Sequence, residues 1–97
     1  VICAFEDLAL GVLEASQNIG RVVPKDLSIV SYHDDGIGRM TEPPLTSITL
    51  PSEQLGRLAV FQVLSARRSS ELMGSRVVVM PTLTERQSVA PLRLSDT

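Results

Sequence analysis

Short apolar runs alternate with longer amphipathic stretches along the chain. Five runs of apolar and β-branched residues have the length and composition of strands in a sheet. They are residues 1–4, 27–32, 46–49, 76–80 and 83–89. The last of these is the most polar, so we expect it at an edge of the sheet.

Two stretches carry the 3.6-residue period of an amphipathic helix. The apolar face predicted for the first helix consists of Leu8, Val12, Ala15 and Ile19, widened by Ala9, Leu13 and Ser16. Glu6 and Asp7 suit the N-terminus of this helix, and Gly20 supplies its end. The second helix is expected over residues 51–68, between the third and fourth predicted strands.

The order of these elements predicts an α/β fold. Helices of this length between strands indicate right-handed crossovers in a mostly parallel sheet flanked by helices. Ligands of such sheets bind beyond the carboxyl ends of the strands. Phe5 and Glu6 follow the first strand, His33 and Asp34 follow the second, and Leu50 follows the third. These residues are therefore candidates for a binding site.

Composition narrows the possible classes of function. The chain has 97 residues, one cysteine, one histidine and a formal net charge of -2 at pH 7. Its scattered basic residues argue against a nucleic-acid-binding face, and no apolar run is long enough to span a membrane. A single cysteine excludes an internal disulfide framework and fits a reducing compartment. Because the chain begins inside an apolar run, without a signal-peptide pattern, we expect a fragment of a longer protein.

Two groups of reactive side chains have both a chemical and a structural interpretation. His33, Asp34 and Asp35 are adjacent, but successive residues rarely converge on one ion, so no metal site is expected. Cys3 and His33 both lie near strand ends and could pair as a thiol nucleophile and its base. No orienting residue or oxyanion motif accompanies them, which favours a buried structural cysteine. We therefore predict no enzymatic activity and no cofactor.

An ordered set of short motifs carries a family resemblance. The motifs are Ala-Leu-Gly at 9–11, Val-Pro-Lys-Asp-Leu-Ser at 23–28, Pro-Pro-Leu-Thr at 43–46, Leu-Gly at 55–56 and Arg-Gln-Ser at 86–88. Together they resemble the C-terminal part of the sensor domain of bacterial transcriptional regulators of the lactose-repressor/galactose-repressor (LacI/GalR) family. The resemblance implies that residues 1–91 form a half-lobe of a type I periplasmic-binding-protein-like fold, followed by a tail at 92–97.

The resemblance also implies a function. The chain would be the effector-binding and dimerisation part of a cytoplasmic regulator that acts by ligand-induced allostery. Its partners would be a small-molecule effector and a second copy of the protein. DNA would be bound only through a helix-turn-helix domain that this chain does not contain, and no membrane is involved. A periplasmic solute-binding protein of the same fold is the alternative.

The residues implied for the effector site depart from the family pattern. Phe5, His33 and Leu50 stand where sugar-responsive members have Asn, Asp and Gln, and these positions bind sugar hydroxyls in those members. Glu6 and Asp34 adjoin them and complete the set implied for the effector site. An aromatic ring, an imidazole and an aliphatic side chain predict a ligand with fewer hydroxyls than a hexose.

A dimer interface is also implied by the resemblance. It comprises Leu10, Leu13 and Glu14 on the first helix, with Ile37 and Thr41 after the second strand. The alternative is that these residues are divided between the monomer surface and the core.

Overall fold

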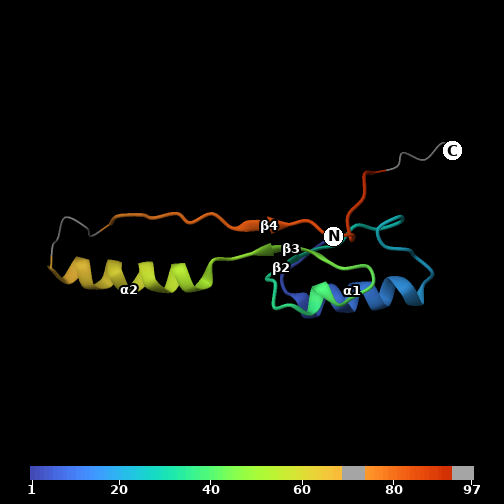
Figure 1. The fold of residues 1–97 in the computed structure, drawn as a ribbon, viewed down its shortest axis with the longest axis horizontal. Coiled ribbons are helices and arrows are strands. Elements are labelled where there is room, and N and C mark those ends of the chain that lie inside the picture. The colour runs from blue at the N-terminus through green and yellow to red at the C-terminus, as the bar shows by residue number, and fades with distance from the viewer. Residues whose placement is uncertain (69–73, 93–97) are drawn as a thin grey trace. The chain divides into compact units, whose positions relative to one another are not determined.

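The computed structural model describes residues 1–68 and 74–92 (Figure 1). The elements are β1 (Ile2–Cys3), α1 (Glu6–Asn18), β2 (Val30–Tyr32), the 3-10 turn η1 (Ile37–Arg39), β3 (Thr46–Thr49), α2 (Ser52–Arg68) and β4 (Thr82–Thr84). They form two compact units. The first comprises Val1–Thr49 with the described part of Leu83–Thr97, and the second is Leu50–Thr82.

The first unit is built on a sheet with the strand order β1-β2-β3-β4. β1 pairs with β2 in parallel, with Ile2 opposite Val30. β2 pairs with β3 in parallel, with Val30 opposite Thr46. β4 lies at the edge beside β3 and runs in the opposite direction (Figure 1). The predicted α/β fold with a mostly parallel sheet is confirmed, and β4 makes the sheet a mixed one.

Strand lengths differ from the prediction. Only Val30–Tyr32 of the predicted 27–32 strand forms β2, and the last strand covers Thr82–Thr84 in place of 83–89. Residues 76–80, predicted as a strand, form no strand. A strand needs a neighbouring strand for its hydrogen bonds, and the described part of the second unit offers this segment only a helix. The β-branched run at 76–80 is therefore extended without being paired.

Helix α1 covers one face of the sheet through contacts with β1 and β2 (Figure 1). It begins and ends as the periodicity predicts, but only the part of the predicted face that Ala9, Leu13 and Ser16 add is buried. The predicted stripe led by Leu8 and Ile19 is wrong, because these side chains are 53% and 74% exposed. The buried stripe of α1 consists of Glu6, Ala9, Leu13 and Ser16. Because this helix is apolar over much of its circumference, its periodicity did not decide which face meets the sheet.

The core of the first unit is small. It consists of Cys3, Ala9, Leu13, Val23, Ile29 and Leu45, with Val12 and Leu27 packed against it. Leu13 was predicted at a dimer interface, but its side chain is only 6% exposed and packs inside the unit, so the structure gives that prediction no support.

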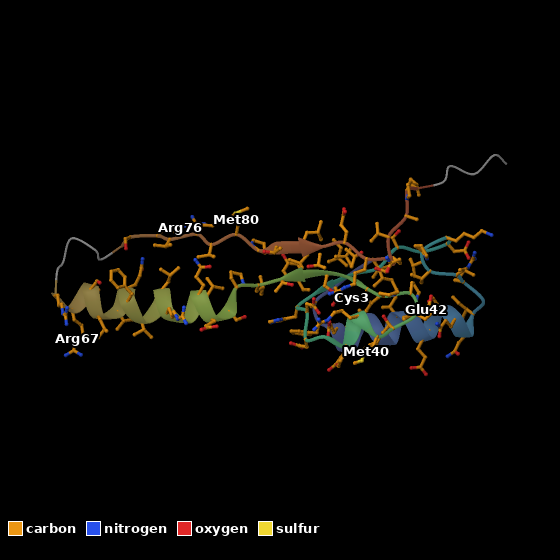
Figure 2. All side chains as sticks on the ribbon, in the orientation of Figure 1. Cys3, Met40, Glu42, Arg67, Arg76 and Met80 are labelled. Carbon is orange, nitrogen blue, oxygen red and sulfur yellow. The ribbon has the colours of Figure 1, made fainter. Side chains whose placement is uncertain are left out.

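The second unit contains α2, which matches the helix predicted over 51–68. No residue of α2 is buried. Leu55, Leu58 and Ala59 of the helix line a shallow apolar groove together with Val77 and Val79. Met80 is 76% exposed and points away from the helix (Figure 2). The described residues of this unit therefore present an apolar surface and include no buried core.

Two further predictions concern the chain ends and membranes. The predicted tail at 92–97 falls, apart from Leu92, outside the described residues. Neither α1 nor α2, nor any other helix within 1–68 and 74–92, is long and apolar enough to cross a bilayer.

Candidate functional site

The carboxyl ends of β1 and β2 form the edge at which a parallel sheet binds ligands. Cys3 is paired with Ser31, so Phe5 and His33 each lie two residues beyond one paired position. The register places the two residues at the same level, and they lie close together because neighbouring strands are about 4.8 Å apart. Phe5 is 58% exposed and His33 is half-buried. We refer to Phe5 and His33 as the strand-end pair.

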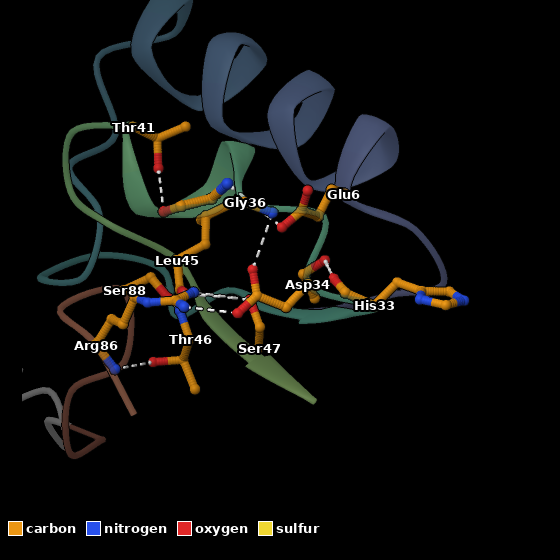
Figure 3. Close-up of polar contacts among 12 residues, drawn as sticks. Glu6, His33, Asp34, Gly36, Thr41, Leu45, Thr46, Ser47, Arg86 and Ser88 are labelled. Atoms are coloured by element: carbon orange, nitrogen blue, oxygen red, sulfur yellow. Dashed lines mark hydrogen bonds and ion pairs between the residues drawn. The ribbon is translucent and has the colours of Figure 1, made fainter. Parts of the chain in front are cut away.

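His33 has an unusual backbone. Its φ is +70°, in the left-handed region that non-glycine residues seldom adopt, although histidine is among those that enter it more often. The backbone N–H of His33 donates to the carbonyl of Ile48 on β3 at 2.8 Å. Its imidazole points away from the neighbouring polar side chains (Figure 3). Such a conformation persists where the surrounding contacts enforce it, and this is common at binding sites.

Asp34, also predicted for the effector site, is engaged by the protein itself. Its Oδ2 accepts a hydrogen bond from Arg86 Nη2 at 2.6 Å, in an ion pair whose side chains are 12% and 13% exposed (Figure 3). Its Oδ1 accepts from the backbone N–H of Gly36 at 3.1 Å. The hydrogen bond from Arg86 holds the pKa of the Asp34 carboxyl below its ordinary value, against the opposing effect of burial. Both carboxylate oxygens therefore already have donors within the fold.

Glu6 lies under η1 and not at the open edge. Its side chain is 2% exposed, and Oε1 accepts the backbone N–H of Gly38 at 3.3 Å (Figure 3). Oε2 is buried and has no partner among the described residues. Because the packing of α1 against η1 shields the carboxylate, the structure gives no support to the predicted contact of Glu6 with an effector.

Leu50 belongs to the second unit, where it is half-buried. Its predicted role at the effector site stays a prediction.

Arg86 is the residue that sequence reasoning missed. Its Nη1 donates to the carbonyl of Leu45 at 2.7 Å and to Ser47 Oγ at 3.2 Å, besides the ion pair with Asp34. Ser88 acts nearby in the same way, since its hydroxyl donates to the Ile29 carbonyl and accepts from Thr46 N. The Arg-Gln-Ser motif was the available signal, but a motif does not name partners about 40 to 60 residues away.

The surface predicted for dimerisation is divided by the structure. Ile37 is 41% exposed and Glu14 is exposed, while Leu10 is half-buried. Thr41 is half-buried and donates its hydroxyl to the carbonyls of Gly38 and Pro43. Since α1 contacts η1, Ile37 lies on an element that packs against the helix of Leu10 and Glu14.

The structure also places the residues considered for metal and thiol chemistry. Within 1–68 and 74–92, no group of three or more His, Cys, Asp or Glu side chains is placed to hold a metal ion. Cys3 is a free, buried cysteine that is 5% exposed. Its side chain belongs to the core, as expected for a structural residue.

Comparison with known proteins assigns the chain to a family. The model of the periplasmic binding protein-like domain matches residues 1–89. The chain belongs to this family. No curated protein sequence matches the chain.

Solved structures extend the comparison. The domain is 33% identical to a transcription regulator from Lactobacillus plantarum over 94% of this chain and 35% of that one, with a TM-score of 0.77. It is 28% identical to a LacI family transcriptional regulator from Enterococcus faecalis V583 with bound ribose, over 92% of this chain and 33% of that one, with a TM-score of 0.75.

A third relative is the transcriptional regulator CelR in complex with cellobiose, at 30% identity over 91% of this chain and 27% of that one, with a TM-score of 0.69. The chain thus spans about a third of the length of these regulators. The predicted resemblance to the LacI/GalR sensor domain is confirmed, and these relatives are regulators, not enzymes.

Proposed function

We propose that this domain is the effector-sensing part of a bacterial transcriptional regulator of the LacI family. The observation that carries the proposal is the match of more than nine-tenths of the chain to transcription regulators, one of them a LacI family regulator with bound ribose and another a complex with cellobiose. The ligand edge of the parallel sheet is where an effector would bind. Binding would act on DNA by allostery, through a helix-turn-helix domain outside this chain.

Phe5 and His33 are the effector contacts that we propose within the first unit. Both side chains reach the surface at the same level of the edge, and neither is engaged in the core. Glu6 and Asp34, the carboxylates that would pair with sugar hydroxyls, are turned toward protein donors. A ligand hydroxyl left unpaired costs about 1–3 kcal/mol. The effector would therefore be less polyhydroxylated than the sugars held by the relatives, with a flat apolar part against Phe5.

Binding measured by calorimetry on the full-length gene product tests this site. Ribose and cellobiose serve as the sugar probes, and benzoate and indole serve as the aromatic probes. We expect binding of an aromatic probe that Phe5→Ala and His33→Ala weaken about tenfold, consistent with the loss of about 1–1.5 kcal/mol of contact energy. Leu8→Ala, on the exposed side of α1, is the matched control and should leave binding unchanged. Sugar binding that is indifferent to both substitutions would refute the assignment.

The dimer, the compartment and the absence of catalysis complete the proposal. A homodimer would form through the surface of Leu10, Glu14, Ile37 and Thr41, in the cytoplasm, without enzymatic activity. The reading frame upstream of the Val1 codon distinguishes this function from its alternative. A helix-turn-helix there supports the regulator, and a secretory signal peptide supports a periplasmic solute-binding protein.

A further inference from the structure

One arginine joins three segments of the first unit that are far apart in the sequence. Arg86 follows β4, its Nη2 bonds to Asp34 after β2, and its Nη1 bonds to Leu45 and Ser47 at the start of β3. The backbone N–H of Arg86 also donates to Thr46 Oγ1 at 3.0 Å. We call Arg86, Asp34, Leu45 and Ser47 the arginine clamp (Figure 3).

The clamp acts directly on the turn that carries His33. Asp34 is the next residue along the chain, and its other oxygen bonds to Gly36 N, so the carboxylate fixes the turn at both ends. On the other side, the N–H of His33 is bonded to Ile48 on β3. The left-handed backbone of His33 is thus held between β3 and the clamp. Without such contacts, a side chain in that region of φ and ψ would relax to a commoner conformation.

We propose that Arg86 is a positioning residue that holds His33 at the ligand edge through Asp34. The inference rests on the proposed function only in treating His33 as an effector contact, because the position of its ring is measurable without any ligand. Arginine is needed for its shape as well as its charge. Its planar fork presents two nitrogens to acceptors on different segments, whereas a lysine ammonium is a single point charge.

The test follows the ring resonances of His33 in NMR spectra of the full-length gene product, where their loss in the His33→Ala variant assigns them. Arg86→Lys retains the charge and loses the fork. The paired substitution Asp34→Leu with Arg86→Met removes both charges together, which leaves no unpaired buried ion and spares the fold. Arg57→Met is the matched control, because Arg57 forms its ion pair with Glu53 on the surface of α2, with both side chains largely exposed.

We expect the ring resonances of His33 to move and broaden in both clamp variants, and its amide hydrogen to exchange about tenfold faster, as for the loss of one hydrogen bond. The Arg57→Met spectrum should match that of the unchanged chain. A clamp variant with native circular dichroism, unaltered His33 resonances and unaltered exchange would overturn the proposal. If the paired variant fails to fold, Arg86→Lys decides alone by the same criterion.

Binding of benzoate and indole to the full-length product separates this inference from the proposed function. If the clamp variants move His33 and weaken binding of an aromatic probe, both are supported. If they move His33 while binding is unchanged, the clamp positions His33 but the effector assignment is wrong. If His33 does not move although binding changes, the positioning role is overturned and the effector site stands.

Discussion

Gly38 lies at the tightest contact between η1 and helix α1. A Cβ at this position would lie 3.1 Å from Glu6 Oε1 and 3.2 Å from Leu45 Cβ. The residue has little room to withdraw, because its N–H donates to Glu6 and its carbonyl accepts from Leu45 N at 2.7 Å. Leu45 is fully buried, so its Cβ has no space to yield. The substitution Gly38→Ala should therefore strain this contact.

The magnitude follows from the two groups that a methyl would displace. Forcing a methyl into a packed site costs about 1–3 kcal/mol. If the Glu6 carboxylate moves aside, the buried N–H at position 38 loses its acceptor, which alone costs about 1–3 kcal/mol. Moving Glu6 aside relieves the steric strain but weakens its hydrogen bond to the N–H at position 38, so the two costs do not add in full. We expect Gly38→Ala to lower the free energy of unfolding by about 2–3 kcal/mol.

Gly11 provides the matched control within α1. A Cβ there meets nothing within 4 Å, and the position is in the interior of the helix. Gly11→Ala should raise the free energy of unfolding by about 0.5–1 kcal/mol, because alanine loses less backbone entropy than glycine on folding. The same chemical change should thus have opposite signs at two positions of one unit.

Urea unfolding followed by far-UV circular dichroism measures both effects, at several protein concentrations and with the denaturant slope compared among variants. Glu6→Ala in the Gly38→Ala background should recover part of the loss, since it removes one of the two colliding groups. Equal stability of Gly38→Ala and the unchanged chain, or equal destabilisation of Gly11→Ala and Gly38→Ala, would contradict the expected steric clash.

Three further outcomes are expected. The pKa of the Asp34 carboxyl is lower in the folded state than its unfolded value of about 3.9. The ionised carboxylate therefore stabilises the fold above that pH, and this stabilisation is lost as pH falls through the folded pKa. The stability gap between the unchanged chain and Asp34→Asn, from urea titrations, should therefore be widest near neutral pH and shrink below about pH 4. Leu13→Glu should abolish folding by burying a charge, seen by circular dichroism, whereas a folded variant with altered sedimentation would restore the interface assignment. The apolar side chains of α2 should drive concentration-dependent association in sedimentation, and Phe61→Gln with Val63→Gln should reduce it.

Periodicity in the sequence determined the helices almost to the residue. Helices predicted over 51–68 and after Glu6 are observed as Ser52–Arg68 and Glu6–Asn18. Helical hydrogen bonds and side-chain spacing are local, so a few turns of sequence contain the information. The order of strands and helices likewise predicted the parallel sheet, and with it the edge at which Phe5 and His33 emerge.

Tertiary structure alone decided which polar groups are free at that edge. The sequence placed Glu6 and Asp34 beside His33 as equal candidates, yet the Glu6 carboxylate is buried with one oxygen bonded to Gly38 N, and the Asp34 carboxylate is paired with Arg86. The donor to Asp34 is Arg86, 52 residues away along the chain. No local pattern encodes such a pairing, because it depends on the fold bringing the segment after β4 across the start of β3.

The strands and the buried face of α1 also depended on tertiary contacts, whereas the bounds of the helices did not. Residues 76–80 have the composition of a strand, but pairing requires a neighbour that the sequence of the segment does not specify. In α1, two adjacent stripes were apolar enough to be buried, and contacts with the sheet and η1 selected the one with Ala9 and Leu13. Local sequence thus determined the helices, while contacts between distant segments determined which extended segments pair as strands, which side chains are buried and which remain to bind a ligand.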